Sequence, residues 1–137
     1  MLNISICDDD TAVCQQLSDY ILRFEEETGQ KMQATIFSSG AELLSDYPCA
    51  TDILLLDIEM GSPNGIETAQ RLRLTVPDLC IIFITGYNQY AVKGYSVRAF
   101  GFLPKPVSYL TFRNELTLAI EQLQRRSSQS SRRLSGL

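Results

Sequence analysis

The stretch ILLL at residues 53–56, followed directly by Asp57, decides the fold class. Its four consecutive aliphatic residues leave no polar face, which is typical of a strand covered on both sides by other elements. A second run of this kind, LCIIFI at residues 79–84, ends just before Thr85. We expect these two runs to be the central strands of a parallel sheet.

Three further short runs rich in Ile, Leu or Phe predict the remaining strands, at residues 2–7, 32–37 and 99–103. Between the strands, apolar residues recur three and four positions apart, which indicates helices with one buried face. The first helix is expected around residues 13–24 and the last around residues 112–123.

Two capping patterns predict where further helices begin. Ser39 with Glu42, and Asn64 with Glu67, have the three-residue spacing of an N-cap and its reciprocal acid. A short fourth helix is expected at about residues 89–95. Five strands that are each followed by a helix imply right-handed crossovers with helices on both faces. The predicted fold is a doubly wound α/β domain with a five-stranded parallel sheet and five helices.

Composition and charge fit one globular domain and exclude several functions. The 137 residues carry a net charge of −4, but residues 125–137 hold four Arg and no acid, so residues 1–124 are strongly acidic. An acidic domain repels nucleic acid, and we expect no DNA binding by residues 1–124 alone. The chain has no histidine, which excludes Ser-His-Asp triads and HExxH zinc sites. Residues 125–137 are expected to form a Ser/Arg-rich linker or disordered tail.

The cysteines and the apolar segments indicate a reducing, aqueous environment. Cys7, Cys14, Cys49 and Cys80 show no C-x-x-C spacing, and buried reduced thiols are the expected state for most of them. No apolar run approaches the roughly 18 residues that a membrane span requires, and the N-terminus lacks a signal-peptide pattern. We therefore expect a cytoplasmic protein without a membrane partner.

Polar residues follow four of the five predicted strands, where a doubly wound sheet binds its ligands. They are Asp8, Asp9 and Asp10 after the first strand, Asp57 after the third, Thr85 after the fourth and Lys105 after the fifth. Each could simply cap a helix or lie in a solvated loop. Their joint placement at one edge of the sheet is harder to explain without a function.

This set of groups suits a divalent cation and a phosphoryl group. Clustered carboxylates from Asp8, Asp9 and Asp57 match the oxygen ligands that Mg²⁺ prefers. Asp57 could attack phosphorus as a carboxylate nucleophile, while Mg²⁺ and Lys105 neutralise the phosphoryl oxygens and Thr85 donates a hydrogen bond. Since a carboxylate is already ionised, this chemistry needs no histidine base.

Five short motifs occur in order along the chain: ICDDD, LLLDIEM, NGIE, FIT and AFGFLPKP. Together they resemble the receiver domain of two-component response regulators, over about residues 2–124. The stretch YAVKGYSVRAFGFLPKPV is most similar to receivers that precede a LytTR-type DNA-binding domain. The resemblance implies a flavodoxin-like receiver fold and phosphorylation by a sensor histidine kinase. DNA would be bound only by a C-terminal domain absent from this sequence, and residues 125–137 are expected to begin the linker to it.

The resemblance also assigns roles to individual residues. The implied phosphoacceptor is Asp57; the Mg²⁺ ligands are Asp8, Asp9, Asp57 and the main-chain carbonyl of Glu59; the phosphate-contacting lysine is Lys105; and the switch residues are Thr85 and Phe102. The Lys105-Pro106 bond is expected to be cis. The fourth helix, fifth strand and fifth helix would form the signalling face. A homodimer would form through this face.

Two departures from the family and two competing functions accompany this interpretation. Gly61 stands where the family commonly has Pro, and Phe102 lacks the hydroxyl of the Tyr found in many receivers.

A phosphatase or phosphotransferase of the haloacid-dehalogenase kind would require Asp at the position of Glu59. A pseudo-receiver that never accepts phosphate would usually have lost an acid or the lysine. A receiver is not an enzyme in the usual sense, since it catalyses only its own phosphorylation and dephosphorylation.

Overall fold

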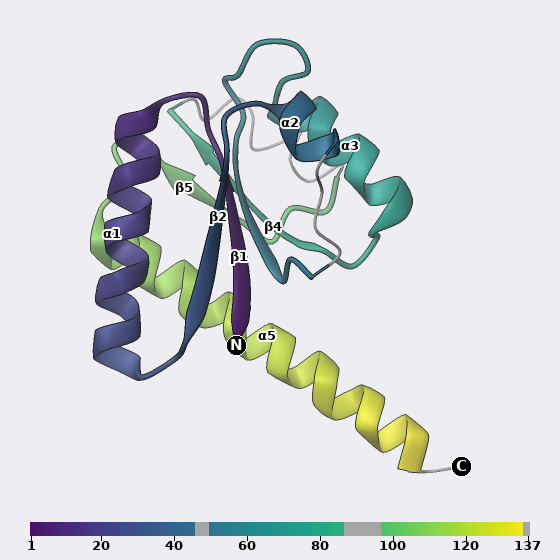
Figure 1. Cartoon of the computed structure of the whole chain (residues 1–137). Helices are drawn as coiled ribbons and strands as arrows, with labels where there is room; N and C mark the ends of the chain where they lie inside the picture. The colour runs from purple at the N-terminus through teal and green to yellow at the C-terminus, as the bar shows by residue number, and fades with distance from the viewer. Residues whose placement is uncertain (46–49, 87–96, 136–137) are drawn as a thin grey trace.

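The computed structural model describes residues 1–45, 50–86 and 97–135, which form a five-stranded parallel sheet with helices on both faces (Figure 1). The strands are β1 (Leu2–Cys7), β2 (Met32–Phe37), β3 (Ile53–Asp57), β4 (Cys80–Thr85) and β5 (Gly101–Pro104), in the order β2-β1-β3-β4-β5. The helices are α1 (Thr11–Thr28), α2 (Gly40–Ser45), α3 (Gly65–Thr75) and α5 (Tyr109–Ser135). The expected fourth helix, residues 89–95, lies outside the described residues. The predicted doubly wound α/β architecture is confirmed.

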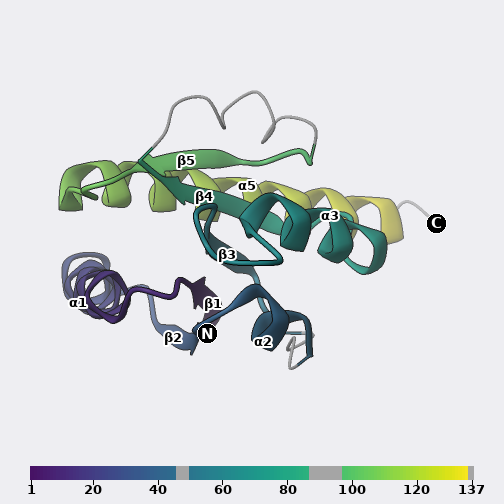
Figure 2. The same ribbon diagram turned by 90° about the horizontal axis from the view of Figure 1, so that it is seen from above.

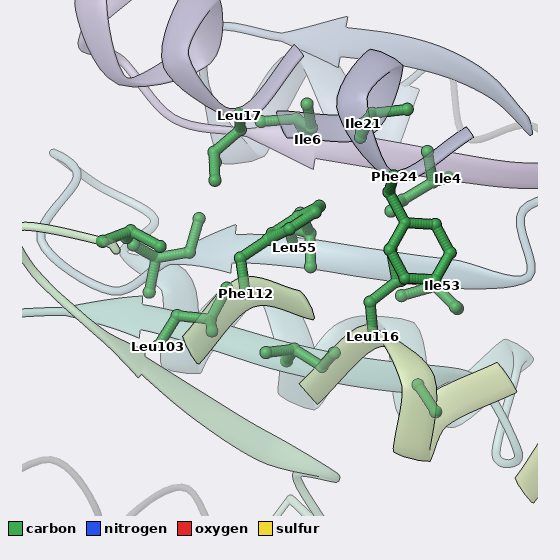
Figure 3. Close-up of a cluster of buried hydrophobic side chains, with 14 of the residues drawn as sticks. Ile4, Ile6, Leu17, Ile21, Phe24, Ile53, Leu55, Leu103, Phe112 and Leu116 are labelled. Atoms are coloured by element: carbon green, nitrogen blue, oxygen red, sulfur yellow. The ribbon is translucent and has the colours of Figure 1, made fainter. Parts of the chain in front are cut away.

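Two buried clusters hold the helices against the sheet. On one face, side chains from α1 and α5 pack on β1, β3 and β4 (Figure 3). On the other face, α2 and α3 cover the alternate residues of the same strands (Figure 2). Every residue of β3 and of β4 is buried, which confirms that these apolar runs are central strands. By contrast, β2 pairs only with β1 and exposes its four inner residues, as an edge strand can.

Both predicted N-caps are confirmed, but at the start of α2 the capping acid forms a hydrogen bond with a different residue from the one expected. Asn64 and Glu67 form a reciprocal capping box at the start of α3. The Ser39 hydroxyl accepts a hydrogen bond from the Glu42 N–H at 3.0 Å, as an N-cap should. The Glu42 carboxylate does not reach back to Ser39, because it accepts a hydrogen bond from the Ser38 hydroxyl at 2.7 Å.

Helix α1 is longer at both ends than residues 13–24, and β5 and α5 also differ from their predicted bounds. The last strand begins at Gly101, two residues later than expected, because residues 97–98 form a turn whose carbonyls accept hydrogen bonds from Arg73. Helix α5 continues to Ser135, through residues expected to form a linker or disordered tail. No Pro or Gly interrupts residues 125–135, and Arg and Gln favour helix. A connecting role for this segment stays a prediction.

Three free thiols confirm the expectation of buried, reduced cysteines. Cys7, Cys14 and Cys80 are buried and form no disulfide, whereas Cys49 lies outside the described residues. Burial, reinforced by the Asp8 carboxylate, raises the pKa of Cys7 to about 12. Burial also raises the pKa of Cys80 to about 11. Within the described part of the chain, none of the helices has the length and hydropathy needed to span a bilayer.

Candidate functional site

The carboxyl ends of the parallel strands bring the predicted site residues together. Asp8 follows β1, Asp57 ends β3 and Thr85 ends β4, so all three lie at the same edge of the sheet. Carboxylate oxygens of Asp8, Asp9 and Asp57 lie within 4.8 Å of one another. Asp8 and Asp57 are each only 1% exposed, whereas Asp9 faces solvent. The predicted acidic cluster is therefore formed, with one open side.

Lys105, which follows β5, supplies a cation that contacts this cluster. Its Nζ lies 3.1 Å from Asp57 Oδ1 and 3.4 Å from Asp8 Oδ2. Burial opposes the charge on the lysine, but the two carboxylates outweigh burial and raise the pKa of Lys105 above its ordinary value. One ammonium group thus bridges two buried carboxylates and leaves them with a net negative charge.

Asp57 is the most perturbed acid of the site. Burial, the neighbouring Glu59 and the charge of Asp8 raise the pKa of Asp57 to about 7, and Lys105 offsets this only in part. A carboxylate in this position needs further positive charge to stay ionised at neutral pH. Asp57 therefore lies in a site that is suited to receive a cation.

The side chain of Glu59 takes part in the site in a way that sequence reasoning missed. Its Oε1 accepts hydrogen bonds from the Thr85 hydroxyl and from the Gly86 N–H, the latter at 3.1 Å. Burial opposes ionisation, but these hydrogen bonds lower the pKa of Glu59. Only the main-chain carbonyl of Glu59 was assigned a role from the sequence. The pairing of β3 with β4 is a signal for this contact. Because Asp57 pairs with Ile84, the residues that follow β3 lie beside those that follow β4.

Buried carboxylate oxygens indicate what the site can bind. One carboxylate oxygen each of Asp57 and Glu59 accepts no hydrogen bond from the described residues, and Asp8 Oδ2 has only the Lys105 ammonium, 3.4 Å away. Buried acceptors of this kind are costly unless a donor or a cation satisfies them. Hard oxygen donors with one solvent-facing acid suit Mg²⁺, which binds a few carboxylates and keeps several waters. The residues present therefore fit the implied metal.

Two further expectations concern β5 and the loop after it. The Phe102 ring is half-buried and packs against Phe83, with ring centroids 5.9 Å apart. The Lys105-Pro106 peptide bond is cis, as expected. The role of Phe102 in switching, and that of the Glu59 carbonyl in metal binding, stay predictions.

The chain is similar to known proteins over most of its length. The family model for the response regulator receiver domain matches residues 4–121. "Sensory transduction protein LytT" of Bacillus subtilis is 31% identical over 106 residues, covering 77% of this chain and 43% of the relative. "Positive alginate biosynthesis regulatory protein" of Pseudomonas aeruginosa is 30% identical and covers 77% of this chain and 42% of the relative. The chain thus spans less than half the length of these curated relatives.

Solved structures show the same fold. A response regulator receiver domain protein (CheY-like) from Methanospirillum hungatei superposes with a TM-score of 0.80 at 22% identity, covering 92% of this chain and 98% of that one. A receiver domain protein from Clostridium thermocellum gives a TM-score of 0.78 at 19% identity and covers 90% and 98%. At these identities the likeness supports the fold alone.

Proposed function

This chain belongs to the response regulator receiver domain family, and from that premise we propose that it is a phosphorylation switch with Asp57 as its acceptor. The observation that carries the proposal is the buried Asp57 carboxylate, placed between the acidic cluster and the Lys105 ammonium 3.1 Å away. A receiver domain takes part in two-component signalling, so the proposed phosphoryl donor is a sensor histidine kinase.

The residues of the site account for the transfer step. An Asp57 oxygen attacks phosphorus and forms a new O–P bond, while the bond between phosphorus and the donor breaks and its electron pair leaves with the donor. Lys105 holds a positive charge where the transferred oxygens arrive. Asp8, Asp9, Asp57 and the Glu59 carbonyl are the proposed ligands of Mg²⁺, which would supply further positive charge for the phosphoryl oxygens.

Thr85 offers a route from phosphorylation to a change at the surface. Its hydroxyl donates to the Glu59 carboxylate, and a phosphoryl group on Asp57 would be a competing acceptor. Transfer of this hydrogen bond would move Thr85 at the end of β4, beside β5 and its half-buried Phe102. We expect the face formed by β5, α5 and the predicted fourth helix to change its affinity for a partner, including a second copy of this chain.

The proposed output is transcriptional. The curated relatives named LytT are longer than this chain, which covers less than half of the B. subtilis protein. In a longer regulator of this kind, phosphorylation of the receiver would control a LytTR-type DNA-binding domain. The acidic surface of residues 1–124 makes direct DNA binding by the receiver itself unfavourable.

Phosphorylation of Asp57 can be tested directly with acetyl phosphate and Mg²⁺. The native chain should gain the mass of one phosphoryl group in intact-protein mass spectrometry. Asp57→Asn should gain none, because an amide oxygen is a much weaker nucleophile than a carboxylate. Asp19→Asn, a matched change on the exposed side of α1, should be phosphorylated normally. The adduct should be labile to hydroxylamine, as acyl phosphates are.

The same experiment separates the two alternatives. A pseudo-receiver predicts no adduct on the native chain at any Mg²⁺ concentration. A phosphatase of the haloacid-dehalogenase kind predicts sustained hydrolysis of p-nitrophenyl phosphate by the native chain, which a receiver should not show. Either result would overturn the proposed function.

Mg²⁺ should stabilise the fold, because it relieves repulsion between buried carboxylates in the native state alone. The gain in free energy of unfolding is about 2.7 kcal/mol when free Mg²⁺ is a hundred times Kd. Asp9→Ala should abolish most of the rise in Tm with Mg²⁺. Asp10→Ala is the control: it removes the side chain that caps α1 by accepting from the Ala12 N–H, so it should lower Tm but keep the Mg²⁺ response. A Tm of the native chain that millimolar Mg²⁺ leaves unchanged would speak against the metal site.

A further inference from the structure

A hollow of about 430 Å³ lies at the opposite end of the sheet from Asp57. It is lined by the first residue of β4, Cys80, and by Ala99 and Phe100, which precede β5. These residues mark the amino ends of the two strands, whereas the acidic cluster lies at the carboxyl ends. Helices α3 and α5 complete the wall with Arg73 and Arg126. The hollow is therefore separate from the phosphorylation site.

Arg73 builds one side of this hollow. Its Nη1 donates to the carbonyls of Pro77 and Leu79 at 3.1 and 2.6 Å. Its Nε and Nη2 donate to the carbonyls of Val97 and Arg98 at 2.7 and 2.9 Å. All four acceptors are neutral main-chain oxygens, so the guanidinium group fixes two loops through hydrogen bonds that do not neutralise its charge.

Two more arginines add to this positive charge. Arg126 Nη1 donates to the Asp78 main-chain carbonyl at 2.6 Å, which again is a neutral acceptor. Among the described residues, none of the side chains of Arg73, Arg98 and Arg126 lies within 4.0 Å of a carboxylate. Burial and the charges of Arg98 and Arg126 lower the pKa of Arg73, and the Asp78 carboxylate offsets this only in part. The hollow is therefore lined by three arginines and one carboxylate, that of Asp78, and keeps an excess of positive charge in an otherwise acidic domain.

The backbone at Arg98 adopts an uncommon conformation beside the hollow. Its φ of 58° lies in the left-handed region, which residues other than Gly, Asn and Asp seldom adopt. Such conformations gather at ligand-binding sites, where the surrounding structure holds them in place. Here Arg73 holds it, through the hydrogen bond to the Arg98 carbonyl. The Arg98 side chain itself is exposed at the rim of the hollow.

We propose that this arginine-lined hollow binds a small phosphorylated anion, with Arg98 and Arg126 as its main contacts. Guanidinium groups match the oxygen geometry of phosphate and form charge-assisted, paired hydrogen bonds with it. The volume lies in the range of small-molecule sites, and the half-buried Phe100 provides an apolar wall beside the charges. An occupant would join α5 to the segment that leads into β5, two elements of the proposed signalling face. The proposal does not depend on phosphorylation of Asp57.

Pyrophosphate and ADP, titrated separately without Mg²⁺ at constant ionic strength, are the probes that test this site. We expect saturable binding by calorimetry and amide shifts in NMR spectra centred on Cys80, Ala99 and Phe100. Tighter binding of ADP than of pyrophosphate would identify a nucleotide, and the reverse would identify the inorganic anion. Arg98→Gln and Arg126→Gln should each weaken binding about tenfold, the loss expected for one charge-assisted hydrogen bond.

The matched control is Arg125→Gln, which removes the same charge from an exposed neighbour on α5 that does not line the hollow. It should bind both probes as the native chain does. An equal loss in Arg125→Gln would show unspecific attraction and overturn the proposal. Shifts confined to Asp57 and Thr85 would place the anion at the phosphorylation site instead. No saturable binding at millimolar concentrations, or binding of a Glu-rich peptide in place of both probes, would also overturn it.

Discussion

Gly65→Ala should destabilise the protein by about 3 kcal/mol and disrupt the proposed phosphorylation site with it. A Cβ at this position would lie 2.2 Å from the Asp57 carbonyl oxygen and 2.7 Å from the Ile58 Cα. Both are main-chain atoms, so no side-chain rotation relieves the overlap. The first turn of α3 must then move away from the end of β3, and the Asp57 main chain must move as well. Urea unfolding measures the loss of stability, and acetyl phosphate measures the loss of phosphorylation.

Gly61→Ala is the control for this prediction, because it makes the same chemical change in the loop that joins β3 to α3. A Cβ at Gly61 meets no atom within 4 Å. Its free energy of unfolding should therefore stay within about 0.5 kcal/mol of the native value. If Gly65→Ala were as stable as Gly61→Ala, the close packing of α3 on the Asp57 backbone would be wrong.

Asp57→Asn should stabilise the metal-free protein at pH 8, by on the order of 3 kcal/mol, and much less at pH 5. The pKa of Asp57 is raised to about 7 in the folded protein, chiefly by burial, from 3.8 in an unstructured chain. The folded state therefore holds a proton more tightly than the unfolded state. The stability that the folded protein gains from protonated Asp57 is complete below about pH 4 and is lost as the pH rises through 7. Asn cannot ionise, so the variant should not show this loss.

Chemical unfolding of both proteins at pH 5 and pH 8, with EDTA present, measures the difference. Asp19→Asn, the same chemical change at an exposed position on α1, is the control for the substitution itself. Added Mg²⁺ should reduce the advantage of Asp57→Asn at pH 8, because the cation stabilises the ionised carboxylate. An equal effect of Asp57→Asn at both pH values would contradict a raised pKa.

Much of the fold could be predicted because its central strands are covered on both faces. Burial of both faces makes residues 53–56 and 79–84 continuously apolar, and that pattern is visible in sequence. The convergence of Asp8, Asp57 and Thr85 follows from the parallel topology alone, since every strand ends at the same edge. The same reasoning could not provide the side-chain role of Glu59. Its bonds to Thr85 and Gly86 depend on a loop conformation that no periodicity encodes.

Other features depend on contacts between distant segments. The late start of β5 follows from Arg73, which lies on α3 and occupies the carbonyls of Val97 and Arg98. Nothing in the sequence around residues 97–101 indicates this partner. The length of α5 was missed for another reason, because the Ser/Arg segment has no apolar stripe from which a buried face could be predicted.

The buried cysteines provide the molecule with internal probes of local opening. Cys7 lies at the carboxyl end of β1, directly before Asp8, and Cys80 lies at the amino end of β4, in the wall of the arginine-lined hollow. Their raised pKa values keep both thiols protonated and slow to react with alkylating reagents while the fold is closed. The alkylation rate of each thiol therefore reports how often its own end of the sheet opens. A ligand that tightens one end should protect one cysteine and leave the other unchanged, so the two ends can be followed independently within a single molecule.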